Sequence, residues 1–68
     1  MKKLIARWET RGKRYWYELY QDDFGYSYSG HFCGGNIGNV TEGMALDHMY
    51  KKVADDAVID SINMKRVF

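Results

Sequence analysis

Two aromatic-rich segments and the turn between them read RYWYELYQDDFGYSYSGHF at residues 14–32. In both segments large apolar or aromatic side chains alternate with their neighbours, which is the period of a half-buried β-strand. The intervening Asp22-Asp23-Phe24-Gly25 has the composition of a turn. Residues 3–10 alternate in the same way and meet the first aromatic segment through Arg11-Gly12. This pattern predicts an antiparallel meander of three strands.

The register follows from keeping apolar residues on one face, because a slip of one residue would turn a whole strand over. A four-residue second turn sets Leu19 opposite Tyr28, and a first turn centred on Arg11-Gly12 sets Trp8 opposite Tyr15. A three-residue first loop with Gly12 in the left-handed region is the alternative, and it would mix the two faces. The predicted core face comprises Leu4, Ala6, Trp8, Tyr15, Tyr17, Leu19, Tyr28 and Phe32.

A glycine-rich connection at residues 33–41 leads into a predicted helix. Asn39 or Thr41 can cap this helix, and Glu42 lies three residues after Asn39, the spacing of a capping box. Apolar residues then recur every three or four positions, which indicates one amphipathic helix of about 15 residues. Its predicted core residues are Leu46, Met49, Tyr50, Val53 and Ala57.

The last segment, residues 58–68, fits either a ragged continuation of the helix or a final strand, and its β-branched residues favour the strand. A chain of 68 residues holds one core, so residues 1–68 form a single domain. We therefore predict an α+β fold in the order β-β-β-α-β. In it, one amphipathic helix packs on one face of an antiparallel three- to four-stranded meander sheet.

Charge and composition exclude several classes of protein. The net charge is +1, so the totals indicate neither a strongly basic polyanion binder nor an acidic mimic. No apolar run approaches the roughly 18 residues that a membrane span requires, and we expect no membrane partner. The lone Cys33 is typical of a reducing compartment, so we expect a cytoplasmic protein.

The face of the sheet that the helix leaves uncovered is the predicted interaction surface. Trp16 and Tyr20 would be exposed there together, which is unusual on a monomer. The register sets Arg7 opposite Trp16 for a cation–π contact and Glu9 opposite Arg14 for an ion pair. The candidate interaction residues are Lys3, Ile5, Arg7, Arg14, Trp16, Tyr20 and His31.

This face permits three interpretations. It can be a solvated sheet surface stabilised by its own charged and aromatic pairs. It can bind a second copy, and we expect a non-enzymatic interaction module that self-associates as a dimer. The alternative is binding of single-stranded nucleic acid by base stacking, which Glu9 and Glu18 on the same face oppose.

Catalytic and cofactor chemistry has weaker support. Residues 34–39 precede a helix N-terminus but match no phosphate-binding fingerprint, so a tight turn explains their glycines. His31, Cys33, Asp47 and His48 have the spacing of no known metal or thiol site. We therefore predict no catalytic, cofactor-binding or metal-binding residues; a thiol or metal enzyme is the third hypothesis, and it requires a reactive Cys33.

The whole chain resembles small proteins of tailed bacteriophages, especially those that infect cyanobacteria. The resemblance lies in Ala6-Arg7-Trp8-Glu9-Thr10, Tyr15-Trp16-Tyr17-Glu18-Leu19, Gly25-Tyr26-Ser27-Tyr28-Ser29-Gly30 and the glycine-rich loop before a single helix. It implies accessory action on a host protein or nucleic acid in the host cytoplasm. The class has no assigned activity, so the resemblance assigns no role to any residue.

Overall fold

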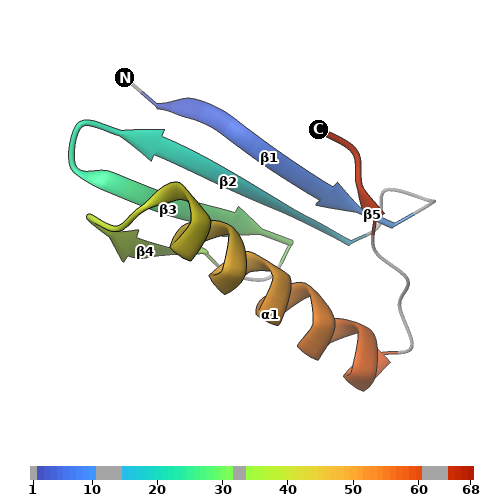
Figure 1. The fold of residues 1–68 in the computed structure, drawn as a ribbon. Helices are drawn as coiled ribbons and strands as arrows, with labels where there is room; N and C mark the ends of the chain where they lie inside the picture. Colours follow the sequence, from blue (N-terminus) through green and yellow to red (C-terminus); the bar gives the residue numbers. More distant parts are fainter. Residues whose placement is uncertain (1, 11–14, 32–33, 61–64) are drawn as a thin grey trace.

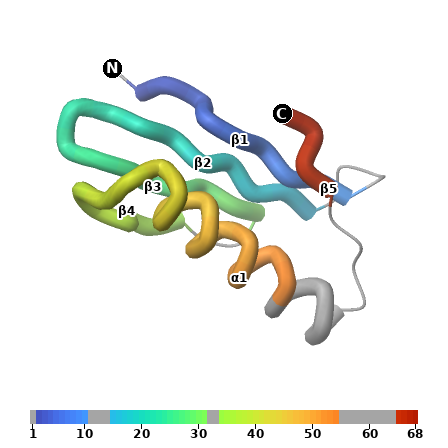
Figure 2. Tube along the Cα trace, viewed as in Figure 1, coloured from blue at the N-terminus to red at the C-terminus, as the bar shows by residue number. Residues whose placement is uncertain are grey.

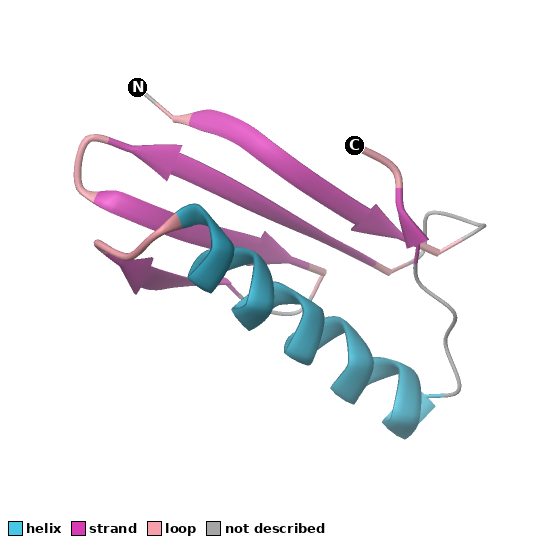
Figure 3. Ribbon diagram, viewed as in Figure 1, coloured by secondary structure: helices cyan, strands magenta, loops and turns pink. Residues whose placement is uncertain are grey.

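The computed structural model describes residues 2–10, 15–31, 34–60 and 65–68, with side chains in α1 described up to residue 54. The described part is an α+β fold in which one helix packs on a five-stranded antiparallel sheet (Figures 1 and 3). The strands follow the spatial order β4-β3-β2-β1-β5. The elements are β1 (Lys3–Glu9), β2 (Trp16–Asp22), β3 (Gly25–Gly30), β4 (Gly34–Gly38), α1 (Glu42–Asp60) and β5 (Lys65–Arg66).

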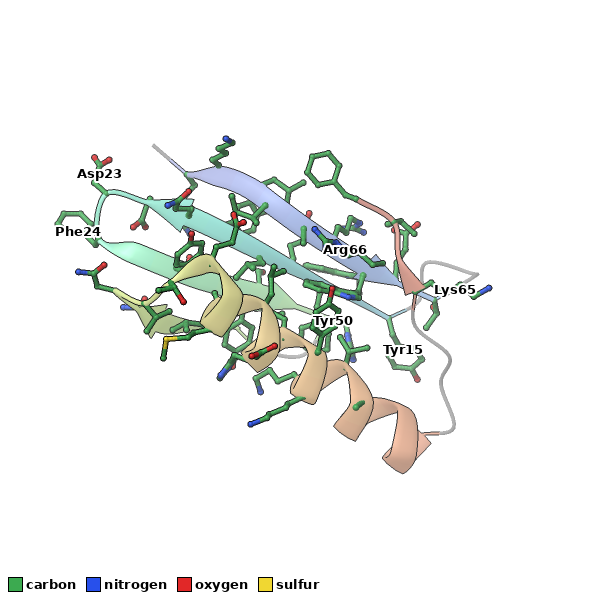
Figure 4. All side chains as sticks on the ribbon, in the orientation of Figure 1. Tyr15, Asp23, Phe24, Tyr50, Lys65 and Arg66 are labelled. Atoms are coloured by element: carbon green, nitrogen blue, oxygen red, sulfur yellow. The ribbon has the colours of Figure 1, made fainter. Side chains whose placement is uncertain are left out.

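The pairing of β2 with β3 confirms the predicted register. Leu19 lies opposite Tyr28, and Asp22 lies opposite Gly25 in the last pair before the turn. Asp22 Oδ1 accepts a hydrogen bond from the Phe24 backbone N–H at 2.8 Å. The turn therefore projects from the end of the sheet, where Phe24 is 86% exposed (Figure 4).

The predicted register of β1 against β2 is wrong by two residues. Trp8 lies opposite Tyr17 instead of Tyr15, and Ala6 lies opposite Leu19. Because the shift is even, these side chains keep their predicted face, and all four are buried.

A β-bulge near the start of β1 overturns three predicted side-chain positions. The register shifts between Leu4 and Ala6, so that Leu4 lies opposite Tyr20 and Lys3 opposite Gln21. The extra residue reverses the alternation of the strand. Ile5 consequently packs against the core, Lys3 shares the face of the core residues, and Leu4 moves to the opposite face.

The strand β4 replaces part of the predicted glycine-rich connection and is an element that the sequence analysis missed. Its backbone pairs with β3, with Gly35 opposite Tyr28. A Cβ atom at Gly35 would lie 2.9 Å from Tyr28 Cε1, so the tyrosine ring occupies the space that a side chain would need. Glycine is depleted in strands, and side-chain alternation therefore gave no sign of β4.

Thr41, rather than Asn39, caps α1. Its Oγ1 accepts a hydrogen bond from the Met44 backbone N–H at 3.2 Å, three residues into the helix. The helix runs four residues longer than the predicted 15, because it continues to Asp60. In the described part of the chain, no helix has the length and apolar character needed to cross a membrane.

The core lies between α1 and one face of the sheet. The predicted residues Leu46 and Val53 are half-buried against it, whereas Tyr50 is 46% exposed. Phe32 and the side chain of Ala57 lie outside the described residues. The buried core residues are Ala6, Trp8, Tyr17, Leu19, Tyr26, Ala45 and Met49, of which Tyr26 and Ala45 were not predicted.

Of the segment 58–68, residues 58–60 belong to α1, and among the described residues 65–68 the predicted strand is the two-residue β5. It lies beside the end of β1 (Figure 2), and the pairing sets Trp8 opposite Arg66. The Arg66 guanidinium lies 5.8 Å from the Trp8 ring centroid, and its Nη1 donates to Tyr50 Oη at 3.2 Å (Figure 4). Arg66 thus joins the last strand to both the sheet and the helix.

Candidate functional site: the open sheet face

The side of the sheet opposite α1 is the candidate site, and we call it the open face. No element of the described chain packs over it (Figure 3). Alternation along each strand, together with the pairing registers, determines which side chains it carries. They are Leu4, Arg7, Glu9, Trp16, Glu18, Tyr20, Asp22, Ser27, Ser29, Asn36 and Lys65, together with Gly25 and Gly34.

Arg7 is the electrostatic centre of the open face. Its Nε donates to Glu9 Oε2 at 2.9 Å, and its Nη1 lies 2.8 Å from Glu18 Oε2. The hydrogen bond to Glu9, with Glu18 adding to it, raises the pKa of Arg7 above its ordinary value, although partial burial opposes this rise. The guanidinium is therefore held by two carboxylates.

The predicted contact between Arg7 and Trp16 is present. The guanidinium carbon lies 5.3 Å from the ring centroid, within the range of a cation–π interaction. The contact is diagonal, because Glu18 is the residue directly opposite Arg7 and Glu9 is directly opposite Trp16. The predicted ion pair between Glu9 and Arg14 falls outside the described residues; within them, Glu9 pairs with Arg7.

Tyr20 extends this network to the other end of the face. Its phenol donates to Glu18 Oε1 at 2.9 Å, and Lys2 Nζ lies 5.7 Å from its ring centroid. Partial burial, followed by the hydrogen bond to Glu18, raises the pKa of Tyr20 above its ordinary value. The Glu18 carboxylate thus binds both Arg7 and Tyr20 and orders the side chains along two strands.

The open face has a step. On β1 and β2 it carries the large side chains of Arg7, Trp16, Glu18 and Tyr20, which we call the ridge. On β3 and β4 it carries only small residues, and these form what we call the shelf. The shelf consists of Ser27, Ser29, Gly34 and Asn36.

Among the seven predicted interaction residues, Arg7, Trp16 and Tyr20 come together on the open face. His31 does not join them: its ring centroid lies 5.3 Å from that of Tyr17, a core residue on the helix side. The backbone N–H of Trp16 donates to His31 Nδ1 at 3.2 Å, which holds the imidazole at the end of the strand. Lys3 and Ile5 are displaced by the bulge, and Arg14 lies outside the described residues.

Sequence reasoning missed the central position of Glu18 and the presence of Leu4 on the open face. Glu18 was expected there only as a charge that opposes nucleic acid, whereas it binds two neighbours at once. Leu4 reaches the face because of the bulge, and neither the alternation nor the composition of residues 3–10 indicates a bulge.

The residues considered for metal or thiol chemistry do not gather in the described structure. Asp47 and His48 are exposed on α1, and the His48 ring centroid lies 5.6 Å from that of Tyr28. In residues 2–10, 15–31, 34–60 and 65–68, no group of three or more His, Cys, Asp or Glu could hold a metal ion. Cys33 lies outside those ranges.

The chain matches no protein-family model, no curated protein and no solved structure.

Proposed function

We propose that this chain is a small non-enzymatic interaction module that self-associates through the open face. One observation carries the proposal: Trp16, Tyr20 and Arg7 lie together on a sheet face that no described element covers. These residue types are enriched in the cores of protein interfaces and dominate their binding energy.

The internal pairing of the charges supports a protein partner. Covering an ion costs free energy, because the ion loses its hydration. On the open face, Arg7 is already bonded to Glu9 and Glu18, and Lys65 lies opposite Glu9. A second protein surface can therefore cover these groups without having to neutralise them itself.

The size of the open face limits the affinity. The four longer strands, β1 to β4, lie about 4.8 Å apart and are about 20 Å long, so they give a face of roughly 400 Å². A standard stable interface buries about 800 Å² per partner, and smaller contacts are typical of weak or transient complexes. We therefore expect a weak dimer, with a dissociation constant of tens of micromolar or higher.

Single-stranded nucleic acid is the second candidate partner. The observation in its favour is that each of the two large, half-buried rings on the face carries a basic side chain, Arg7 on Trp16 and Lys2 on Tyr20. Against it, a phosphate would have to compete with two carboxylates for Arg7. This competition favours protein over nucleic acid as the partner.

The resemblance to small tailed-phage proteins supports a cytoplasmic location and adds a host protein as a further class of partner. Such a protein would use the same open face, where Arg7, Trp16 and Tyr20 lie together on neighbouring strands.

The experiment compares Trp16→Ala with Phe24→Ala by light scattering from tens to hundreds of micromolar. Phe24 is a matched aromatic control, because it is exposed at the turn and away from the open face. We expect the wild type and Phe24→Ala to form dimers and Trp16→Ala to remain at 8.0 kDa. A monomeric wild type throughout this range would contradict self-association.

An oligonucleotide titration of the same three proteins, followed by tryptophan fluorescence at low salt, separates the two candidates. Binding of nucleic acid predicts quenching in the wild type, with a steep salt dependence. Quenching by the oligonucleotide, for a wild type that stays monomeric by light scattering on its own, would favour the nucleic-acid alternative.

A further inference from the structure

The step in the open face determines how a second copy can sit on it. Two packed sheets lie about 10 Å apart, and that gap holds one layer of interdigitated side chains. Two ridges of Trp16, Glu18 and Tyr20 placed against each other would have to interdigitate large side chains within this gap, and they would leave the shelves uncovered. A ridge placed on a shelf of serine, glycine and asparagine fills it.

We propose, on the basis of the self-association proposed above, that two copies pack about a two-fold axis parallel to the strands. Such an axis, placed between β2 and β3, sets the ridge of each copy on the shelf of the other. A two-fold axis that lies between the two sheets, parallel to them but perpendicular to the strands, would instead set β2 on β2 and ridge on ridge. Of these two axes, the shape of the face selects the first.

Charge selects the same arrangement. With ridge on ridge, the Glu18 side chains of the two copies would approach each other along the centre of β2, and like charges repel. With ridge on shelf, Glu18 of one copy lies over Ser29 of the other, because the two residues are at the same level along their strands. The shelf carries no charged side chain. The hydroxyl of Ser29 and the amide of Asn36 can donate hydrogen bonds to the carboxylates of the partner.

The test fills the shelf and leaves the ridge intact. Ser29→Tyr on β3 and Asn36→Tyr on β4 each place a large side chain where the partner's ridge would lie. Gln21→Tyr is the matched control, since Gln21 is an exposed strand residue that shares the opposite face with Leu19. Far-UV circular dichroism verifies that each variant is folded, and sedimentation velocity gives its dissociation constant.

We expect both shelf variants to raise the dissociation constant about fivefold or more and the control to leave it unchanged, because the usual cost of overpacking corresponds to a change of at least that size. If both shelf variants form dimers as strongly as the wild type, the ridge-on-shelf arrangement is overturned, while self-association itself stands. If the wild type forms no dimer at any concentration, the arrangement and the proposed self-association fail together.

Discussion

Gly25→Ala tests the close approach between the turn after β2 and the end of β4. A Cβ atom at Gly25 would overlap the carbonyl of Gly38 and lie 2.8 Å from the Asn39 nitrogen. Both contacts are with backbone, which cannot rotate away as a side chain can. Gly25 also has a φ of +127°, a region that residues with a Cβ rarely adopt.

Two other glycines separate these effects. Gly38 has a φ of +104° but would meet nothing within 4 Å, so Gly38→Ala measures the backbone strain alone. Gly43, in the first turn of α1, has neither problem. We expect Gly43→Ala to stabilise the protein by up to about 1 kcal/mol, because alanine is the better helix former.

The expected loss in the free energy of unfolding is the sum of the backbone strain and the overpacking. Positive-φ strain is about 1–3 kcal/mol, and overpacking against fixed atoms adds about 1–3 kcal/mol. Gly25→Ala should therefore cost about 2–6 kcal/mol and Gly38→Ala about 1–3 kcal/mol. The free energy of unfolding of a 68-residue domain is only about 3–10 kcal/mol, so Gly25→Ala should unfold a measurable fraction of the protein.

Urea denaturation followed by tryptophan fluorescence measures these differences. With a slope of roughly 1 kcal/mol per molar urea, each kcal/mol moves the midpoint by about 1 M. Equal losses in Gly25→Ala and Gly38→Ala would refute the contact between the turn and β4, and with it the placement of the fourth strand.

Two further predictions concern single hydroxyl groups on the open face. Partial burial and the hydrogen bond to Glu18 raise the pKa of Tyr20 in the folded protein, so the stabilising effect of the protonated phenol is complete below the ordinary pKa of about 10 and is lost as the pH rises through the folded value. The difference in urea midpoint between the wild type and Tyr20→Phe should therefore shrink as the pH rises above about 10. A constant difference would contradict the raised pKa of Tyr20. Ser27 Oγ is buried without a hydrogen-bond partner in the described structure. Ser27→Ala should therefore leave the stability unchanged or raise it by about 1 kcal/mol. A loss of stability, measured by thermal unfolding, would indicate that this hydroxyl has a partner.

Much of the candidate site follows from the sequence. Alternation along residues 16–20 places Trp16, Glu18 and Tyr20 on one face in any register, because the side-chain period of a strand is two. For the same reason, the two-residue error in the predicted pairing of β1 with β2 left the core residues Ala6 and Trp8 on their predicted face. The contact between Arg7 and Trp16 was correctly predicted, because diagonal neighbours in a sheet remain within reach of long side chains.

Other features depend on interactions that no local pattern contains. The bulge in β1 exchanges the faces of Leu4 and Ile5. Strand β4 exists because its backbone pairs with β3 under the ring of Tyr28. The partners of Glu18 come from a neighbouring strand and from its own, which a register must first bring together.

The sequence by itself determined the alternating strands, the amphipathic helix and the composition of the central open face, because these depend on side-chain period and hydrophobicity along one segment. Only the tertiary structure decided the bulge, the glycine strand at one edge, the two-residue strand at the other and the step between ridge and shelf. The two edge strands arise where their backbone groups pair with a strand from another part of the sequence. The free energy of such contacts belongs to the pair and cannot be read from either residue alone.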